Sequence, residues 1–318
     1  MMFSSRAAVV VVVGFLGAAG RQAAPPTIQV DGAQIFRDVE TLAADDMEGR
    51  LVGSPGGRRA REYVRGRLER AGVAPIGGRF ECPFTFTTRS GERREGTNLV
   101  GVIRGSREPA RYIVVTAHYD HIGVRGGQVF NGADDNASGV AALLAVAAHF
   151  GSRPPEHSLL IAALDGEEAG LQGAKALMRD PPVGVAAMVV NVNMDMVGRD
   201  PDNKLFAVGV RHYPFLKPYL ESAARPPVVL AFGHDSPGRW AAGPGQDWTA
   251  DSDHYVFHQA GIPFVYFGVE DFGQHHKATD DSGTIGREFL AGAAATVIEA
   301  IRQFDAHLEE IAAHRATK

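Results

Sequence analysis

Several features that would point to particular classes of protein are scarce or missing in this sequence. It contains one cysteine, Cys82, so no disulfide can form within the chain. It has no basic tract, and its formal charge of −5 argues against nucleic acid as a partner. It also lacks an acidic tail, which excludes a solvating, disordered segment of that kind. No internal repeat and no domain-sized linker divides the chain.

The first 24 residues differ in composition from the rest of the chain. Arg6 precedes an apolar run over residues 7–16, and small residues follow at 17–20 and 23–24. The run is shorter than the roughly 20 apolar residues that a membrane-spanning helix needs. The pattern therefore predicts a signal peptide over residues 1–24, an extracytoplasmic (periplasmic or secreted) location, and no stable membrane span after cleavage. An uncleaved N-terminal anchor is the alternative.

Apolar runs and helical patterns alternate along residues 25–318, which we predict to form a single domain. The expected strands cover residues 80–88, 98–103, 112–117, 158–164, 187–192 and 262–269. The expected helices cover residues 32–47, 58–71, 140–150, 168–178 and 290–311, with an irregular segment over 49–57. Strands that are apolar throughout and separated by helices are typical of an α/β sheet with both faces covered.

Histidine and carboxylate residues stand where four of the apolar runs end. They occur in HYDH (118–121), DGEE (165–168), NMD (193–195) and QHH (274–276). A fifth group, GADDNASG (132–139), lies in the loop between the strand at 112–117 and the following helix. In an α/β sheet, ligands bind beyond the carboxyl ends of the strands. We therefore expect these five groups to meet at one edge of the sheet and to form a binding site.

These residue types favour a catalytic metal site. His, Asp and Glu without Cys form the ligand set of catalytic zinc, whereas structural zinc favours thiolates. About five good ligands are present, and two ions bridged by a carboxylate would use all of them. Asp135, in a tight loop, is suited to be the bridge. Cations would make the adjacent charges of Asp134 and Asp135 tolerable, while Asn136 begins the helix. A helix N-cap with a spare acid is the alternative.

The ordered motifs resemble those of the M28 family of co-catalytic zinc aminopeptidases. In sequence order they are AHYDH, GADDNASG, LDGEEAGL, NVNMDMVG, SDHYVFHQAGIP and HHKATDD. They extend roughly from Arg58 to the C-terminus, and their combination is specific although each motif alone is weak. The resemblance implies a three-layer α/β/α zinc-peptidase fold with a mixed, mainly parallel eight-stranded sheet. It also implies two Zn²⁺ per chain as cofactors.

The resemblance also implies a role for each residue of the site. The ligands, matched position by position, are His118 and Asp195 for one zinc and Glu168 and His276 for the other, with Asp135 bridging. Glu167 matches the general base, which takes a proton from the attacking water and passes it to the leaving amine. Asp120 matches the carboxylate that orients the His118 imidazole. His276 is preferred to His275 as ligand because Asp280 then completes the family's His-x-x-x-Asp pattern.

Two positions depart from the family pattern. His275 stands where many members have a tyrosine that helps to polarise the substrate carbonyl, and we expect it to contact the substrate. Asp251 stands where some members carry a basic residue, and Asp253 is expected at the wall of the substrate pocket. Both departures concern substrate preference and not the metal site. The remaining histidines of the motifs are expected to be structural or to support the ligands: His121, His254 and His258.

The function implied is that of an exported aminopeptidase that removes N-terminal residues from peptide substrates. One alternative is a related single-zinc glutaminyl cyclase, which uses an Asp-Glu-His set. Another is a carboxypeptidase of the same superfamily, which needs a basic group to hold the C-terminal carboxylate. A metal-free binding module on the same fold is the alternative outside enzymes. The complete set of five ligands together with Glu167 favours the aminopeptidase, and no pattern in the sequence fixes an oligomeric state.

Overall fold

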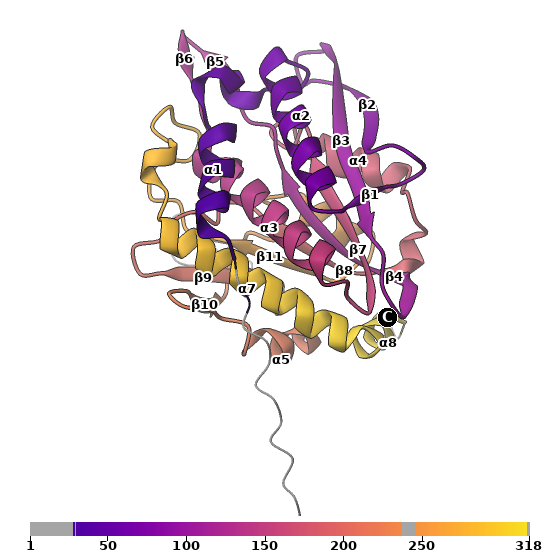
Figure 1. The fold of residues 1–318 in the computed structure, drawn as a ribbon. Coiled ribbons are helices and arrows are strands. Elements are labelled where there is room, and N and C mark those ends of the chain that lie inside the picture. The colour runs from indigo at the N-terminus through magenta and orange to yellow at the C-terminus, as the bar shows by residue number, and fades with distance from the viewer. Residues whose placement is uncertain (1–27, 29, 237–245, 317–318) are drawn as a thin grey trace, which may run out of the picture.

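A mixed β-sheet runs through the middle of the protein and carries helices on both of its faces (Figure 1). The computed structural model describes residues 28, 30–236 and 246–316. The predicted signal peptide at residues 1–24 lies outside these residues. No helix in the described ranges is long and apolar enough to cross a membrane.

Within the described residues the sheet is eight strands wide, as the resemblance implies, although it contains nine strands. The additional strand arises because β1 and β2 pair with different parts of the same edge of β3. From one edge to the other, the strands are β2 (Glu81–Thr87) and β1 (Ala74–Pro75), β3 (Arg93–Ile103), β7 (His157–Leu164), β4 (Glu108–His118), β8 (Met188–Met194), β11 (Phe264–Gly268), β9 (Lys204–Val208) and β10 (Val229–Phe232). The four central strands β7, β4, β8 and β11 are parallel to one another, and their outer neighbours β3 and β9 are antiparallel to them.

The helices form a layer on each face of this sheet. They are α1 (Gly32–Leu42), α2 (Pro55–Arg70), α3 (Gly139–Ser152), α4 (Gln172–Arg179), α5 (Lys217–Leu220), α6 (His254–Gln259), α7 (Arg287–Ala306) and α8 (Leu308–Ala316). Helices α1, α2, α3 and α7 lie together on the near face in Figure 1, while α4 and α6 contact each other on the opposite face. A separate hairpin is formed by β5 (Val124–Arg125) and β6 (Gln128–Val129). Short helical turns occur at Asp45–Arg50, Ala133–Ser138, Val185–Ala187, Pro214–Leu216 and Ser282–Thr284.

Both faces of the central strands are buried, which explains why these strands are apolar throughout. Every residue of β7 is buried. Ile161 and Ala163 belong to the core under α1, α2, α3 and α7, whereas Leu160 and Ala162 belong to the core under α4 and α6. Because successive side chains of a strand point to opposite faces, two covered faces require a continuous apolar run and not an alternating one.

Some predicted bounds are wrong, and several short elements are not predicted: α5, α6, β1, β5, β6, β9 and β10. The helix predicted over 168–178 begins only at Gln172, because Gly166 and Leu171 have φ values of 71° and 59° and residues 165–171 form a loop. The helix predicted over 290–311 is interrupted at His307, between α7 and α8. The sequence does not predict β9 and β10, which are short and only partly buried.

The carboxyl ends of the parallel strands lie at one edge of the sheet and carry the predicted site residues. His118 is the last residue of β4, and Asp195 follows β8 directly. Glu167 and Glu168 lie in the loop that follows β7, and His276 lies beyond the end of β11. The fold therefore brings together residues that are far apart in the sequence, at the edge where α/β sheets bind ligands.

Candidate metal centre and catalytic site

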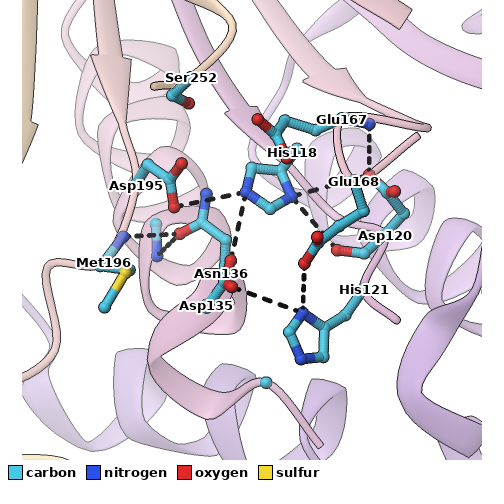
Figure 2. A network of polar contacts seen from close by, with 12 residues as sticks. His118, Asp120, His121, Asp135, Asn136, Glu167, Glu168, Asp195, Met196 and Ser252 are labelled. Atoms are coloured by element: carbon cyan, nitrogen blue, oxygen red, sulfur yellow. Dashed lines mark hydrogen bonds and ion pairs between the residues drawn. The ribbon is translucent and has the colours of Figure 1, made fainter. Parts of the chain in front are cut away.

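Two groups of potential metal ligands meet at this edge, and they share one residue. One group contains His118, Asp135 and Asp195, and the other contains His121, Asp135, Glu168 and His276. Within each group, the ligand atoms all lie within 4.8 Å of one another. Figure 2 shows the side chains converging on Asp135 from β4, from the loop after β7 and from the end of β8. His118 and Asp195 thus lie in one group and Glu168 and His276 in the other, as expected. Asp135 belongs to both groups.

The two oxygens of Asp135 face different groups. Its Oδ1 lies 3.5 Å from Nε2 of His118. Its Oδ2 lies 3.4 Å from Nε2 of His276 and 3.7 Å from Nδ1 of His121. A carboxylate that bridges two metal ions presents one oxygen to each ion, and Asp135 has this arrangement.

The chemistry of the site fits a bound cation. Several of its buried polar atoms have no hydrogen-bond partner among the described residues: His118 Nε2, both ring nitrogens of His121, Glu168 Oε1 and Asp195 Oδ1. Buried polar atoms normally have partners, so such a concentration requires an explanation. A metal ion at each group would satisfy all of them except one ring nitrogen of His121, and a donor set of imidazole and carboxylate without thiolate fits zinc.

The charges around Asp135 keep this carboxylate ionised. Burial raises its pKa, but the nearby imidazoles of His121 and His276 outweigh this effect, and the pKa of Asp135 lies below its ordinary value. Burial also raises the pKa of Glu167, and here the opposing charge effect is too small to offset it. Its pKa is well above the ordinary value because burial and the neighbouring acids Asp253 and Asp195 exceed the opposing effect of His118.

Glu167 lies in neither ligand group but lines the same cleft. The cleft has a volume of about 990 Å³, and its walls also include Asp135, Glu168 and Asp195. The backbone N–H of Glu167 donates to Oδ1 of Asp120 at 3.0 Å (Figure 2). The same Oδ1 lies 3.6 Å from Nδ1 of His118, which is also 3.2 Å from the backbone oxygen of Asp120. Asp120 thus contacts both the predicted base and the predicted ligand His118.

Of the two side chains expected to contact the substrate, one lines the cleft and the other does not. His275 lines the cleft, with its Nε2 3.5 Å from Oδ2 of Asp135, and its contact with substrate stays a prediction. The position predicted for Asp253 is wrong, because Asp253 is fully buried and does not line the cleft, whereas Asp251 does. His254 and His258, which were expected to be structural or to support the ligands, have contacts outside the two ligand groups. A ring nitrogen of His254 lies 3.0 Å from the Trp248 carbonyl, and one of His258 lies 2.7 Å from the Tyr213 hydroxyl.

The backbone at His276 is strained. Its φ is 56°, a conformation that a non-glycine residue seldom adopts. Strain of this kind is often found at functional sites, where the surrounding structure holds the residue in place.

A comparison with known protein families gives a match over the part of the chain that carries both ligand groups. The model of Peptidase family M28 matches residues 98–301, a range that includes every member of both ligand groups. The chain belongs to peptidase family M28. The membership expected from the motifs is thereby confirmed.

Relatives and solved structures in the comparisons support zinc as the metal and confirm the fold class. A probable zinc metalloprotease of Pyrenophora teres is 33% identical over 205 residues, which are 57% of this chain and 40% of that protein. The chain spans about half the length of the curated relatives it matches. A Zn-dependent exopeptidase from Parabacteroides distasonis superposes with a TM-score of 0.70 and 21% identity over 87% of this chain and 99% of that one. A glutaminyl cyclase from Porphyromonas gingivalis gives 0.70 and 20%, over 86% and 98%. At these identities the two structures show a shared fold alone.

Asp280 holds the loop that carries Asp135 in this M28 site. Its carboxylate accepts hydrogen bonds from the backbone N–H groups of Asp134 and Asp135, both at 3.0 Å. Asp134 in turn accepts from the N–H of Gly198 at 2.8 Å, and Arg199 lies 3.3 Å from both carboxylates. The two adjacent aspartates of GADDNASG therefore differ in role, since Asp134 holds the loop together and Asp135 belongs to both ligand groups.

We expect Asp280→Asn to lower the free energy of unfolding by about 2–4 kcal/mol, because it weakens two charge-assisted hydrogen bonds in a buried site. The measurement is urea denaturation in excess chelator, so that only the protein contributes. The control is Asp281→Asn. This exposed neighbour accepts from the N–H of Ser282, and asparagine replaces aspartate well at such a cap, so a change below about 0.5 kcal/mol is expected. Equal stability of the two variants would contradict the role of Asp280.

Arg50 is a component of the site that the sequence does not reveal. Its side chain is fully buried and donates only to backbone carbonyls in the described residues. The acceptors are Tyr119 at 2.8 Å, Leu42 at 2.7 Å, Asn131 at 2.5 Å and Gly132 at 2.9 Å. Arg50 thus joins the end of α1 to the loops that carry His121 and Asp135. It lies in the segment 49–57, which was expected to be irregular and has no periodic pattern to mark it.

We expect Arg50→Lys to lower the free energy of unfolding by about 3–5 kcal/mol, because an ammonium group cannot reach four carbonyls in the plane of a guanidinium and leaves buried acceptors without partners. The matched change Arg59→Lys alters an exposed side chain with one bond to the Asp46 carbonyl and an ion pair with Glu48. There we expect less than about 1 kcal/mol. Denaturation of both variants tests this, and a mild effect of Arg50→Lys would show that the loops hold their positions without it.

Proposed function

We propose that this protein is an exported di-zinc aminopeptidase that hydrolyses N-terminal residues from peptides. The proposal depends above all on Asp135, whose two oxygens face two separate ligand groups. His118 and Asp195 would hold one zinc ion, and Glu168 and His276 the other. Bound zinc would polarise the scissile carbonyl and lower the pKa of a coordinated water. Export is proposed from the signal-peptide pattern of residues 1–24.

Glu167 would act as the general base and then as the general acid. Its carboxylate lines the cleft beside both ligand groups, and the position of its backbone is set by the hydrogen bond to Asp120. In this position it can take a proton from the attacking water and deliver it to the nitrogen of the leaving amine. The acids of the cleft, which include Asp251 and Asp271, favour a substrate with a protonated α-amine.

A carboxypeptidase is the second candidate, because a specific feature of the cleft favours it. Such an enzyme needs a basic group for the C-terminal carboxylate, and Arg89, Arg94 and Arg125 line the cleft. The two candidates differ in which end of a peptide must be free. The same arginines would suit an aminopeptidase that acts on short peptides, where the carboxylate lies within the cleft.

Four forms of one short peptide distinguish these functions: unmodified, N-acetylated, C-amidated, and with an N-terminal glutamine. An aminopeptidase cleaves the amidated form and not the acetylated form, and a carboxypeptidase does the reverse. A glutaminyl cyclase releases ammonia from the glutamine peptide without cleaving any peptide bond. Mass spectrometry of the products is the measurement. We expect cleavage of the first peptide bond in the unmodified and amidated forms. Cleavage of the acetylated form at its C-terminus would overturn the aminopeptidase proposal.

A further inference from the structure

His121 lies in the second ligand group, although it is not among the five ligands that the family resemblance implies. We propose that His121 binds directly, through Nδ1, to the zinc ion held by Glu168 and His276. This ion then has four protein ligands, whereas the ion at His118 and Asp195 has three. The inference rests on the di-zinc site proposed above.

The position of Nδ1 is that of a ligand. The side chain of His121 is fully buried, and its Nδ1 lies 2.7 Å from Oε1 of Glu168 and 3.7 Å from Oδ2 of Asp135 (Figure 2). Despite this closeness, neither Nδ1 nor Oε1 of Glu168 has a hydrogen-bond partner of acceptable geometry within the described part of the chain. A buried ring nitrogen and a buried carboxylate oxygen that face the same space can both be satisfied by a shared cation.

The ring of His121 is held in a different way from that of His118. Nδ1 of His118 lies 3.2 Å from the backbone oxygen of Asp120, the usual kind of partner for a histidine that binds metal. Nε2 of His121 has no such hydrogen bond to any residue that the structure describes. Packing fixes the ring instead, because a Cβ atom at Gly132 would lie 2.6 Å from both Cγ and Cδ2 of His121. With φ of 53°, Gly132 lets the backbone pass directly beside the ring.

The fourth ligand would make the two ions unequal. Zinc with four protein ligands is typical of closed, structural sites, whereas zinc with three keeps a position open for water or substrate. Figure 2 draws the Glu167 side chain beside the ring of His118, which belongs to the three-ligand group. The open position would therefore lie beside the proposed base, and the ion at His121 would exchange more slowly.

The test is a long-range ¹H–¹⁵N spectrum of the zinc-loaded full chain with ¹⁵N-labelled histidine, which separates coordination through Nδ1 from coordination through Nε2. We expect three zinc-bound histidines, with His118 and His276 bound through Nε2 and one further histidine through Nδ1. The variant His121→Asn removes the Nδ1 signal, and its amide can still donate to Glu168. Zinc affinity at one site should fall by about 100-fold or more, since loss of a merely supporting residue costs about 10–100-fold. The matched variant His118→Asn should weaken the other site and retain the Nδ1 signal.

Two other results are decisive against this inference. A wild-type spectrum with two zinc-bound histidines, both through Nε2, together with two zinc ions per chain, refutes the role of His121 and leaves the proposed function intact. A wild-type chain that binds one zinc ion or none refutes both proposals. Because the wild-type spectrum decides the question alone, a failure of His121→Asn to fold does not affect the conclusion.

Discussion

Glu167→Gln is expected to lower kcat for peptide hydrolysis by about 10²–10⁴-fold, the usual contribution of a general base. The side chain keeps its size but can no longer accept a proton. Glu167 belongs to neither ligand group, and its backbone contact with Asp120 does not involve the altered atoms. Zinc content and KM should therefore stay close to those of the wild type. Steady-state kinetics and metal analysis of the same sample provide the measurement.

The adjacent Glu168→Gln serves as the matched control. Glu168 belongs to the second ligand group, and its Oε2 lies 2.8 Å from Nε2 of His276. We expect this variant to lose one zinc ion, so that the two neighbouring glutamates fail for different reasons. If Glu167→Gln lost zinc, or kept more than about a tenth of the wild-type kcat, its assignment as the base would be wrong.

Asp135→Asn is expected to weaken binding of both zinc ions, because one of its oxygens faces each ligand group. In the wild type, zinc binding at each site should raise the free energy of unfolding by about 4 kcal/mol when free zinc is 1,000 times Kd. Asp135→Asn should lose both this stabilisation by zinc and the hydrolytic activity. Thermal denaturation with and without added zinc measures the effect: zinc raises the Tm of the wild type and leaves that of Asp135→Asn nearly unchanged.

The neighbouring Asp134→Asn should behave differently. The pKa of Asp134 is raised to about 7, mainly by burial and to a smaller extent by the charge of the nearby Asp280. This carboxyl is therefore already partly neutral at physiological pH. An amide in its place is therefore a modest change, and Asp134 is in neither ligand group. We expect this variant to respond to zinc as the wild type does. A zinc response that survives in Asp135→Asn, or is lost in both variants, would contradict the bridging role.

The sequence predicts the middle of the sheet and most of the site for the same physical reason. Strands covered on both faces need continuous apolar runs, as in β7, and this pattern is visible without any structure. The ends of those runs then mark where ligands gather, which leads to His118 and Asp195. The short outer strand β9 and the edge strand β10 have weaker patterns because they are only partly buried.

The parts that the sequence does not predict depend on contacts between distant segments. Arg50 acts through backbone carbonyls at the end of α1 and in two loops, and carbonyls leave no signature in a sequence. His121 looks like any histidine near a ligand until its distances to Glu168 and Asp135 are known. Asp253 was expected in the cleft because it belongs to a motif, but the backbone turns its side chain inward and leaves Asp251 at the surface of the cleft.

The most direct test of this account is the zinc content of the purified wild-type chain, measured together with hydrolysis of a peptide that has a free N-terminus. The account predicts two zinc ions per chain, loss of hydrolysis when a chelator removes them, and recovery when zinc is returned. A chain that holds one zinc ion or none, or one whose hydrolysis is unaffected by the chelator, would contradict it.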